Sequence, residues 1–485
     1  MRTALPLALA LALPLAAMAG EAKPRRLTAL EKAHIVIEET QPLKFPRGNR
    51  LPFIVWGLQN IQAQTDAELE DVLRKLADRG IATVWGWNVR DKEKSLAAFL
   101  KAAALHKKLG LPVVVNSTSV MHQFFNGDEQ TAHVDAKGEK FFDTSFGGRV
   151  KLGCPFSVTY RFMAIREQVE FFVQACKENA APLDIVIADW ELDGPIEWND
   201  AWNQAKRCAR CRKNIPNIEN FAAFQAACRK VRHDMQRECY ARVVLAHYPK
   251  ALVGNYAEYP NNGWRYWYDY FEEDAKPPVP VQLDHRAPYR PWTRDFAATE
   301  YTFAMPVVYT WYRTFNWYDF KSDDYRWFYN MLLVATNAGQ NAPAGLPVIT
   351  FVHWHTTAPP KDAAPVPQLS EAKYQDLLWH MLLRGHDGLA MWCMPEETAK
   401  ETRLVQEVYA ASLEFKDFLD LGKPICWDVP KTPGPVVSAL SLDGRLLVRR
   451  TDFDDNTAPV VIQAGGRTVR IPRADGKTQV IALPQ

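Results

Sequence analysis

Two carboxylates end the apolar run LDIVIADWE, which spans residues 183–191 of the 485-residue chain. If the run is a β-strand, side chains two residues apart share a face, so Asp189 and Glu191 would lie side by side at the strand end. Repulsion between neighbouring carboxylates raises the pKa of one of them, and a carboxyl that keeps its proton can act as a general acid. The spacing therefore predicts a catalytic acid pair. Two solvated acids that simply end a strand would give the same sequence pattern.

The pair suits one mechanism better than another. In a glycosidase with two catalytic carboxylates, the groups flank the bond and stand about 5–5.5 Å or 6.5–9.5 Å apart. Two acids on one strand do not flank a sugar well, whereas in substrate-assisted hydrolysis an N-acetyl group of the substrate is the nucleophile. We then expect Glu191 to be the acid, Asp189 to orient the acetamido N–H, and Tyr309 to steady the acetamido oxygen.

Eight apolar runs alternate with helical patterns and would position these residues. Near-continuous apolar strands suit a parallel sheet that is buried on both faces, and the alternation is typical of a (β/α)₈ barrel, or TIM barrel. A nucleotide-binding doubly wound sheet would need a glycine-rich turn after its first strand, where this chain reads Leu58-Gln59-Asn60. The expected strands cover residues 52–57, 81–87, 111–116, 183–191, 251–256, 304–310, 346–352 and 388–392.

The C-terminal ends of barrel strands form the active-site face. In this chain those ends are rich in aromatic residues, which are most often core material but also offer flat faces to sugar rings. The expected substrate-binding residues are Trp56, Trp87, Asn255, Tyr256, His353 and Trp392.

The flanks of the barrel differ from it in composition. Residues 1–19 have a basic start, a short apolar core and an Ala-x-Ala site, which is typical of a secretory signal peptide and predicts a secreted or periplasmic protein. Residues 20–50 read as a polar lead-in, and the barrel is expected over 51–422. Residues 425–485 show short alternating runs separated by Asp-Gly and Gly-Gly turns, which predict a small antiparallel β module.

Four of the eight cysteines cluster after the acidic strand, at Cys208, Cys211, Cys228 and Cys239. An exported protein can form disulfides, and a structural zinc site usually shows two Cys-x-x-Cys pairs where this cluster has one. Local disulfides are therefore favoured over zinc, and no metal or other cofactor is expected at the catalytic site. The other cysteines are scattered: Cys154, Cys176, Cys393 and Cys426.

Four segments resemble the hyaluronidase family of glycoside hydrolases and follow the order found there. They are Asp189-Trp190-Glu191, Gly254-Asn255-Tyr256-Ala257, Met305-Pro306-Val307-Val308-Tyr309 and Gly388-Leu389-Ala390-Met391-Trp392. The resemblance implies a retaining, metal-independent endo-glycosidase that acts on polymers containing N-acetylhexosamine. The chain departs from the family after the acid pair, where it reads Leu192-Asp193-Gly194-Pro195. The chitinase-type motif is absent, because Ile187 replaces its first aspartate.

Other readings remain open at the level of sequence. A barrel glycosidase could pair Glu191 with Glu258 or Glu396 on an unacetylated glycan. The barrel could bind carbohydrate without cleaving it, or His353, His355 and Asp189 could hold a catalytic metal. The net charge of +2 offers no bulk electrostatic drive toward nucleic acid or a membrane surface. The expected partner is a polysaccharide or oligosaccharide.

Overall fold

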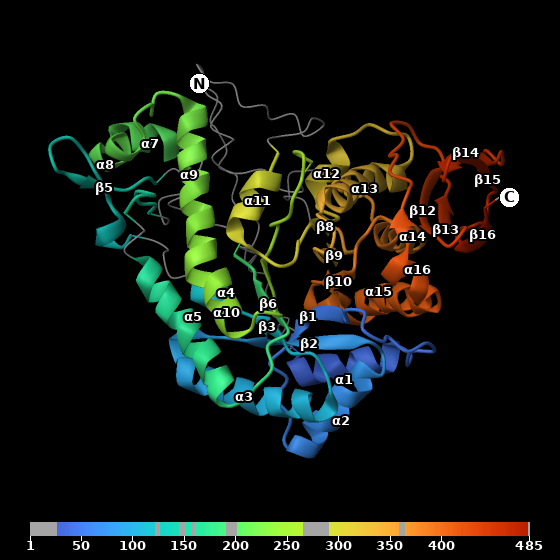
Figure 1. Ribbon diagram of the computed structural model, residues 1–485, viewed down its shortest axis with the longest axis horizontal. Coiled ribbons are helices and arrows are strands. Elements are labelled where there is room, and N and C mark those ends of the chain that lie inside the picture. Colours follow the sequence, from blue (N-terminus) through green and yellow to red (C-terminus); the bar gives the residue numbers. More distant parts are fainter. Residues whose placement is uncertain are drawn as a thin grey trace, which may run out of the picture.

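The computed structural model describes residues 27–121, 127–144, 151–157, 161–190, 201–264, 291–357 and 364–483. Eight parallel strands form one curled sheet in the order β7-β6-β3-β2-β1-β10-β9-β8 (Figure 1). The expected (β/α)₈ barrel, followed by a small antiparallel module, is confirmed. The barrel strands are β1 (Phe53–Gln59), β2 (Ile81–Gly86), β3 (Val114–Asn116), β6 (Ile185–Ala188), β7 (Leu252–Asn255), β8 (Val307–Tyr309), β9 (Ile349–His353) and β10 (Gly388–Met391).

Alternate residues of each strand separate two apolar cores. In β6, Ile185 and Ile187 belong to the core inside the barrel, whereas Val186 and Ala188 belong to the core between the sheet and its helices. This is the alternation that a strand buried on both faces requires. The inner core consists of Ile54, Trp56, Ala82, Val84, Val114, Ile185, Ile187, Tyr256, Phe303, Met305, Val307, Tyr309, Ile349, Phe351 and Ala390.

The two end strands of the sheet, β7 and β8, meet through the segment 302–305. Thr302 donates its N–H to the carbonyl of Val253 at 2.9 Å, and its hydroxyl oxygen accepts the N–H of Val253 at 2.8 Å. The ring of Phe303 lies so close to Gly254 that a Cβ there would stand 2.6 Å from it. A glycine at position 254 therefore lets the seam between β7 and β8 close.

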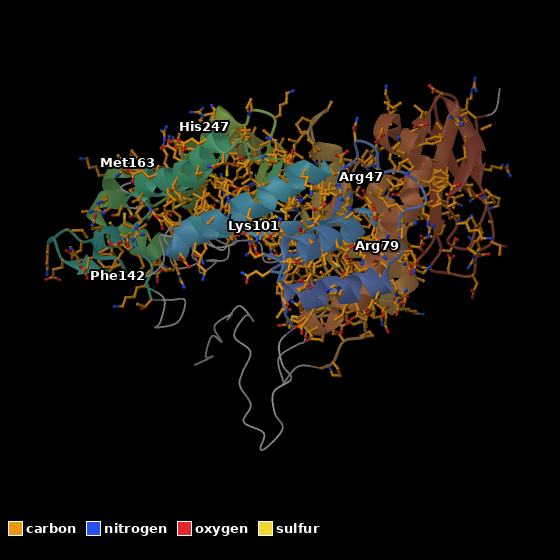
Figure 2. The ribbon with its side chains drawn as sticks, turned by 90° about the horizontal axis from the view of Figure 1, so that it is seen from below. Arg47, Arg79, Lys101, Phe142, Met163 and His247 are labelled. Carbon is orange, nitrogen blue, oxygen red and sulfur yellow. The ribbon has the colours of Figure 1, made fainter. Side chains whose placement is uncertain are left out.

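Helices cover the outer face, and four of them begin at a polar cap. Thr65, Asn220, Ser322 and Ser370 each accept an N–H of the first helical turn, as N-cap residues do. Figure 2 shows α1 (Ala29–Glu39), α2 and α3 side by side on the outside of the molecule. The helices around the barrel are α2 (Asp66–Ala77), α3 (Lys92–Leu109), α5 (Arg161–Glu178), α9 (Phe221–Met235), α10 (Arg242–His247), α13 (Asp323–Asn341), α14 (Glu371–Leu382), α15 (Thr398–Ser412) and α16 (Lys416–Leu421).

Shorter elements occupy the connections. A π-helical turn, Gln236–Ala241, joins α9 to α10. The remaining elements before the C-terminal module are α4 (Thr118–Met121), β4 (His133–Val134), β5 (Lys140–Phe141), α7 (Ala201–Arg207), α8 (Ala209–Asn214), α11 (Thr293–Thr299), α12 (Tyr312–Asn316) and the 3₁₀ turns Val89–Asp91, Glu129–Thr131, Pro395–Glu397 and Leu413–Phe415.

The lead-in contains a helix that its polar composition did not predict. Helix α1 (Ala29–Glu39) starts with a capping box formed by Thr28 and Glu31. It buries Ala33 and Val36 and packs against α15 and α2. The expected signal peptide, residues 1–19, lies outside the described residues. Within the described residues, each helix is too short or too polar to cross a membrane.

The C-terminal module packs on the barrel flank formed by α14. His380 of α14 bonds Ser438 through Nδ1 at 2.7 Å and Thr451 through Nε2 at 3.0 Å, and Asp376 forms an ion pair with Arg449. Positive φ angles at Asp443-Gly444 and Gly465-Gly466 form tight hairpin turns. The module strands are β11 (Lys423–Pro424), β12 (Val436–Leu442), β13 (Arg445–Thr451), β14 (Val460–Ala464), β15 (Arg467–Ile471) and β16 (Gln479–Ala482).

Candidate active site at the barrel mouth

Three of the predicted site residues form one aromatic cluster where β8, β9 and β10 end. The rings of Tyr309 and His353 stack with centroids 4.0 Å apart and planes 13° apart. Trp392 lies 6.1 Å from the Tyr309 ring and 5.2 Å from the His353 ring. Burial and then the neighbouring His355 hold the pKa of His353 well below its ordinary value, so the imidazole is neutral. The cluster is therefore uncharged: His353 is fully buried within it, whereas Trp392 is partly exposed.

Two further predicted residues join this cluster from the strands on either side of it, Tyr256 from the end of β7 and Trp56 from β1. Tyr256 lies 6.2 Å from the Tyr309 ring, and both Tyr256 and Trp56 pack edge-on against Phe351. All of these residues belong to or pack against the core inside the barrel. Phe351 is thus the floor on which the mouth aromatics rest.

Asp189 lies at the same end of the barrel, just beyond β6. The register pairs Ala188 with Asn255, so the next residues, Asp189 and Tyr256, are neighbours on the two strands. Asp189 shares the inward face of Ile187 and follows it by two residues. Burial raises the pKa of Asp189 to about 6, because a carboxylate loses hydration there. Its predicted partner, Glu191, lies outside the described residues.

The main chain of the acidic segment is held by α4 on one side and by β7 on the other. Asp189 donates its N–H to the hydroxyl of Thr118 at 2.8 Å. Trp190 donates its N–H to the amide oxygen of Asn255 at 2.9 Å and accepts from the amide nitrogen at 3.1 Å. Asn255 is fully buried, and its amide positions the main chain of Trp190; its expected contact with substrate stays a prediction. Nothing in the sequence pattern around Thr118 pointed to its contact with Asp189.

Trp87, also expected to bind substrate, packs behind the sheet and at the same time borders one of the clefts at the mouth. Its side chain is 2% exposed and stacks on Phe172 with ring centroids 5.1 Å apart and planes 5° apart. Both residues belong to the core between the sheet and its helices. The physical reason is strand alternation, because Trp87 follows Trp85 by two residues and Trp85 already faces outward.

A buried carboxylate that the sequence analysis missed supports the aromatic cluster. Glu401 of α15 is fully buried and accepts the N–H groups of Trp354 and His355 at 2.9 and 2.8 Å. It also contacts Nδ1 of His355. One signal was present, because Glu401 lies at helical spacing from the apolar residues Leu404 and Val405 and so falls on the inward face of its helix.

Two open clefts flank the end of β1 and share Gln59. One, of about 430 Å³, has mostly polar side chains around it, and Asn116 donates to Gln59 at 2.9 Å there. The other, of about 520 Å³, includes Trp56 and Trp392. Because Thr118 lines the first cleft and also contacts Asp189, this cleft borders the acidic segment. The mouth thus combines amide groups with aromatic faces, a lining that suits hydroxyl-rich ligands.

The alternative carboxylates are placed differently. Glu258 is 2% exposed and forms an ion pair with Arg232 at 2.8 Å. It also accepts from Gln236 at 3.2 Å and from the Trp292 indole at 2.8 Å. Its charge is therefore compensated within the protein. Glu396 lies on an exposed 3₁₀ turn.

The expectation of local disulfides is wrong. All eight cysteines lie in the described residues and all are free. Cys228 and Cys239 belong to one helical rod, α9 and the π turn after it. Eleven residues at about 1.5 Å each separate them by about 16 Å, too far for a disulfide. Cys208 and Cys211 instead lie near Cys154, one of the cysteines that the sequence shows as scattered. The sulfurs of Cys154 and Cys211 are 3.3 Å apart.

Comparisons with known proteins give only distant structural likeness. No family model matches the chain, and no curated protein matches it in sequence. Among solved structures the chain is similar to alpha-L-fucosidase isoenzyme 2 from Paenibacillus thiaminolyticus, at 11% identity and a TM-score of 0.44, over 78% of this chain and 51% of that one. The chain thus spans about half the length of that fucosidase.

Two further solved structures are matched over most of both chains. The endo-beta-1,4-mannanase from Thermotoga petrophila is 12% identical with a TM-score of 0.41, over 87% of this chain and 89% of that one. Eubacterium rectale Amy13B is 9% identical with a TM-score of 0.47, over 94% and 99%. Because one fold supports many chemistries, likeness at this level carries no argument about activity.

Proposed function

We propose that this chain is a retaining glycoside hydrolase that cleaves a glycan containing N-acetylhexosamine, with the acetamido group of the substrate as nucleophile. The observation that carries the proposal is the position of Asp189. It leaves β6 on the inward face of the barrel, beside Tyr256 and at the end where the aromatic cluster lies. A carboxyl with a pKa raised to about 6, fixed next to aromatic faces, fits the handling of an acetamido N–H on a sugar.

The mechanism assigns one step to each residue. Glu191 protonates the leaving oxygen while the acetamido oxygen attacks the anomeric carbon and the glycosidic bond breaks. Asp189 accepts the acetamido N–H and stabilises the positive charge that develops on the oxazolinium ring, and Tyr309 donates a hydrogen bond to the acetamido oxygen. Water then opens the ring from the other side as Glu191 takes its proton. Two inversions at one carbon give net retention.

The neighbourhood of Asp189 favours this scheme over one with a second catalytic carboxylate. Glu258, an alternative catalytic carboxylate, follows the end of β7 by three residues. It is buried and forms an ion pair with Arg232. A carboxylate held in this way is unsuited to attack a sugar. The resemblance of four strand-end segments to the hyaluronidase family supports the same mechanism and an endo mode of action.

The test is a hydrolysis screen over hyaluronan, chondroitin, chitin-type oligosaccharides and bacterial glycans, with the products separated by size. We expect cleavage of at least one N-acetylated polymer, inhibition by an N-acetylhexosamine thiazoline, and loss of cleavage in Glu191→Gln with binding retained. Hydrolysis only of unacetylated glycans, or a lack of thiazoline inhibition, would contradict substrate assistance. Equal binding by both proteins with no cleavage by either would instead indicate a carbohydrate-binding barrel.

We also propose that the protein is exported, because residues 1–19 have the features of a signal peptide. Expression of the full chain followed by fractionation tests this. The mature protein is expected outside the cytoplasm with Gly20 as its first residue, and an intact Met1 terminus on cytoplasmic protein would contradict it.

A further inference from the structure

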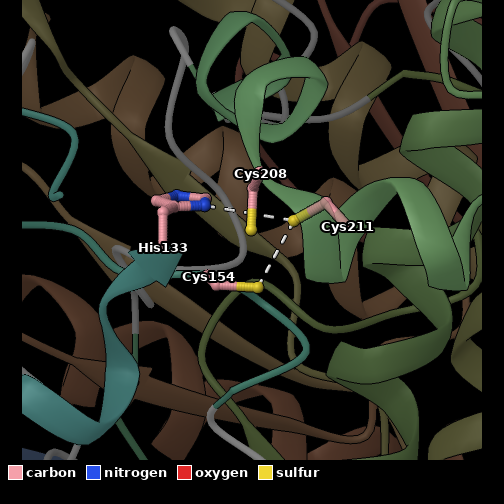
Figure 3. Close-up of side chains that lie close together, drawn as sticks. All are labelled: His133, Cys154, Cys208 and Cys211. Atoms are coloured by element: carbon pink, nitrogen blue, oxygen red, sulfur yellow. Dashed lines mark hydrogen bonds between the residues drawn. The ribbon is translucent and has the colours of Figure 1, made fainter. Parts of the chain in front are cut away.

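Four side chains with metal-binding atoms meet outside the barrel mouth. They are His133, Cys154, Cys208 and Cys211, and their ligand atoms all lie within 4.8 Å of one another. The sulfurs of Cys154 and Cys211 are 3.3 Å apart, and Nδ1 of His133 is 4.0 Å from the Cys211 sulfur. Figure 3 shows the four side chains pointing toward one centre from three separate segments.

We propose that His133, Cys154, Cys208 and Cys211 bind one zinc ion in a structural site. Zinc–sulfur and zinc–nitrogen bonds of about 2.3 and 2.0 Å place the sulfur and nitrogen ligands of a tetrahedral ion about 3.5–3.8 Å apart. The distances of 3.3 and 4.0 Å in the cluster lie just below and just above that range, so small side-chain movements complete the tetrahedron. Three thiolates and an imidazole form a donor set that zinc favours and that calcium and magnesium do not.

Burial makes the site structural. Each of the four residues is at most 1% exposed, and four protein ligands fill a tetrahedral zinc without an open position for water or substrate. Of the described residues, these alone form a group of three or more that could hold a metal ion. The aromatic cluster at the mouth, with His353 and His355, does not belong to it.

The site joins two insertions that leave neighbouring strands. Strands β3 and β6 pair directly, so the connections at their C-terminal ends start side by side. His133 on β4 and Cys154 belong to the connection after β3, whereas Cys208 and Cys211 lie at the start of α8 in the connection after β6. The ion therefore fixes α8, in the connection after β6, to the insertion after β3.

The packing around Cys154 and His133 brings the two insertions together. Cys154 donates its N–H to the carbonyl of Thr131 at 2.7 Å, and a Cβ on Gly153 would stand 2.2 Å from the same oxygen. The imidazole of His133 stacks on Phe141 at 5.0 Å, and the guanidinium of Arg207 lies 4.5 Å from that ring. Glycine at position 153 and the stacked rings together bring Cys154 and His133 to the two cysteines of α8.

The experiment measures the metal content of the mature protein, which is the whole chain after the signal peptide, by elemental mass spectrometry. We expect close to one zinc ion per chain that survives gel filtration, and loss of most of it in Cys208→Ser and Cys211→Ser. Cys228→Ser is the matched control, because Cys228 is buried on α9 outside the cluster, and it should keep the metal. Cobalt substitution should give the visible absorption of a tetrahedral thiolate site.

A second measurement decides the case even if the serine variants do not fold. Native mass spectrometry of the unmodified protein, before and after a strong chelator, reports the ion and the thiols together. A mass that matches bound zinc with all eight thiols present supports the site. A metal-free chain lighter by one pair of hydrogen atoms, with a tryptic link between Cys154 and Cys211, would overturn it in favour of a disulfide. Neither readout depends on glycan hydrolysis, so this proposal and the proposed function fail separately.

Discussion

The side-chain amide of Asn255 makes two hydrogen bonds to the main chain of Trp190, accepting its N–H at 2.9 Å and donating to its carbonyl at 3.1 Å. This pair of bonds fixes the residue between Asp189 and Glu191. Since the two acids flank Trp190 in sequence, the amide of β7 sets the direction in which the chain leaves β6.

Replacing Asn255 by alanine should therefore lower kcat more than it raises KM. The change removes both bonds and leaves the buried polar groups of Trp190 without their partner, at a cost of about 1–3 kcal/mol in the free energy of unfolding. Misplacement of the acids should reduce kcat about a hundredfold. Steady-state kinetics and urea unfolding measure the two effects. Asn330→Ala, at a buried asparagine of α13, is the control; equal loss of kcat in both variants would contradict a positioning role.

Asp189→Asn should remove the acidic limb of the pH–rate profile. With a folded-state pKa of about 6, Asp189 gains its proton as the pH falls through that value and can no longer accept the acetamido N–H as a carboxylate. The kcat of the unmodified enzyme should therefore fall below pH 6, and that of the variant should be about a hundredfold lower and flat there. Asp417→Asn, at an exposed position of α16, should keep the limb. A limb that persists in Asp189→Asn would exclude Asp189 as its origin.

The same shift in pKa predicts a change of stability. Burial raises the pKa of Asp189 above its unfolded value, so the folded state holds the proton more tightly and loses stability as the pH rises from about 4 to 6. Asp189→Asn should therefore melt at a higher temperature than the unmodified protein at pH 8, with the difference vanishing near pH 4. Calorimetry at both pH values measures it.

Glu401→Gln should destabilise the end of β9. Glu401 accepts the main-chain N–H groups of Trp354 and His355. The amide of a glutamine would instead turn N–H donors of its own toward these groups. The expected cost is about 1–3 kcal/mol in the free energy of unfolding, together with a higher KM because Trp392 packs against His355 at 5.2 Å. Glu407→Gln, an exposed residue of the same helix paired with Arg403, should change neither quantity by much.

His386 should contribute to acid unfolding. It donates from Nε2 to the carbonyl of Ala335 at 2.9 Å and contacts Thr350 through Nδ1, and burial lowers its pKa to about 4. The unfolded chain therefore binds this proton first, and stability is lost as the pH falls from about 6.5 to 4, by about 3 kcal/mol. His386→Asn should be less stable at pH 7.5 and should show a shallower loss over this range in urea unfolding; an unchanged slope would assign the loss to other histidines.

Much of the fold could be predicted from apolar periodicity. The helical spacing of Leu96, Phe99, Leu100 and Ala103 predicts a helix over residues 92–109, and α3 spans the same residues. The hairpins of the module turn at the Asp-Gly and Gly-Gly pairs that mark them. Short strands buried on both faces leave a clear signal, because every residue of the run is apolar.

The candidate site was harder to predict because the odd or even position of a residue along its strand decides which face of the sheet its side chain joins. Trp56 and Tyr309 share the face of Ile54 and Val307 inside the barrel, whereas Trp87 and Asn255 share the outward face of Trp85 and Val253. The sequence shows the alternation but does not mark which face is the interior. The metal-binding group was beyond reach for another reason, since its ligands come from three segments and only Cys208 and Cys211 show a recognisable spacing.

The seam between β7 and β8 is hydrogen-bonded differently from the other strand junctions of the barrel. Elsewhere a ladder of main-chain bonds joins neighbouring strands, but here a threonine hydroxyl replaces a carbonyl as the acceptor for Val253. Local opening requires the fewest broken bonds at such a point, so amide hydrogen exchange should begin there and spread outward in both directions. Because β7 also carries Asn255, the first fluctuation to loosen the ring would be felt at the acids, long before the barrel itself unfolds.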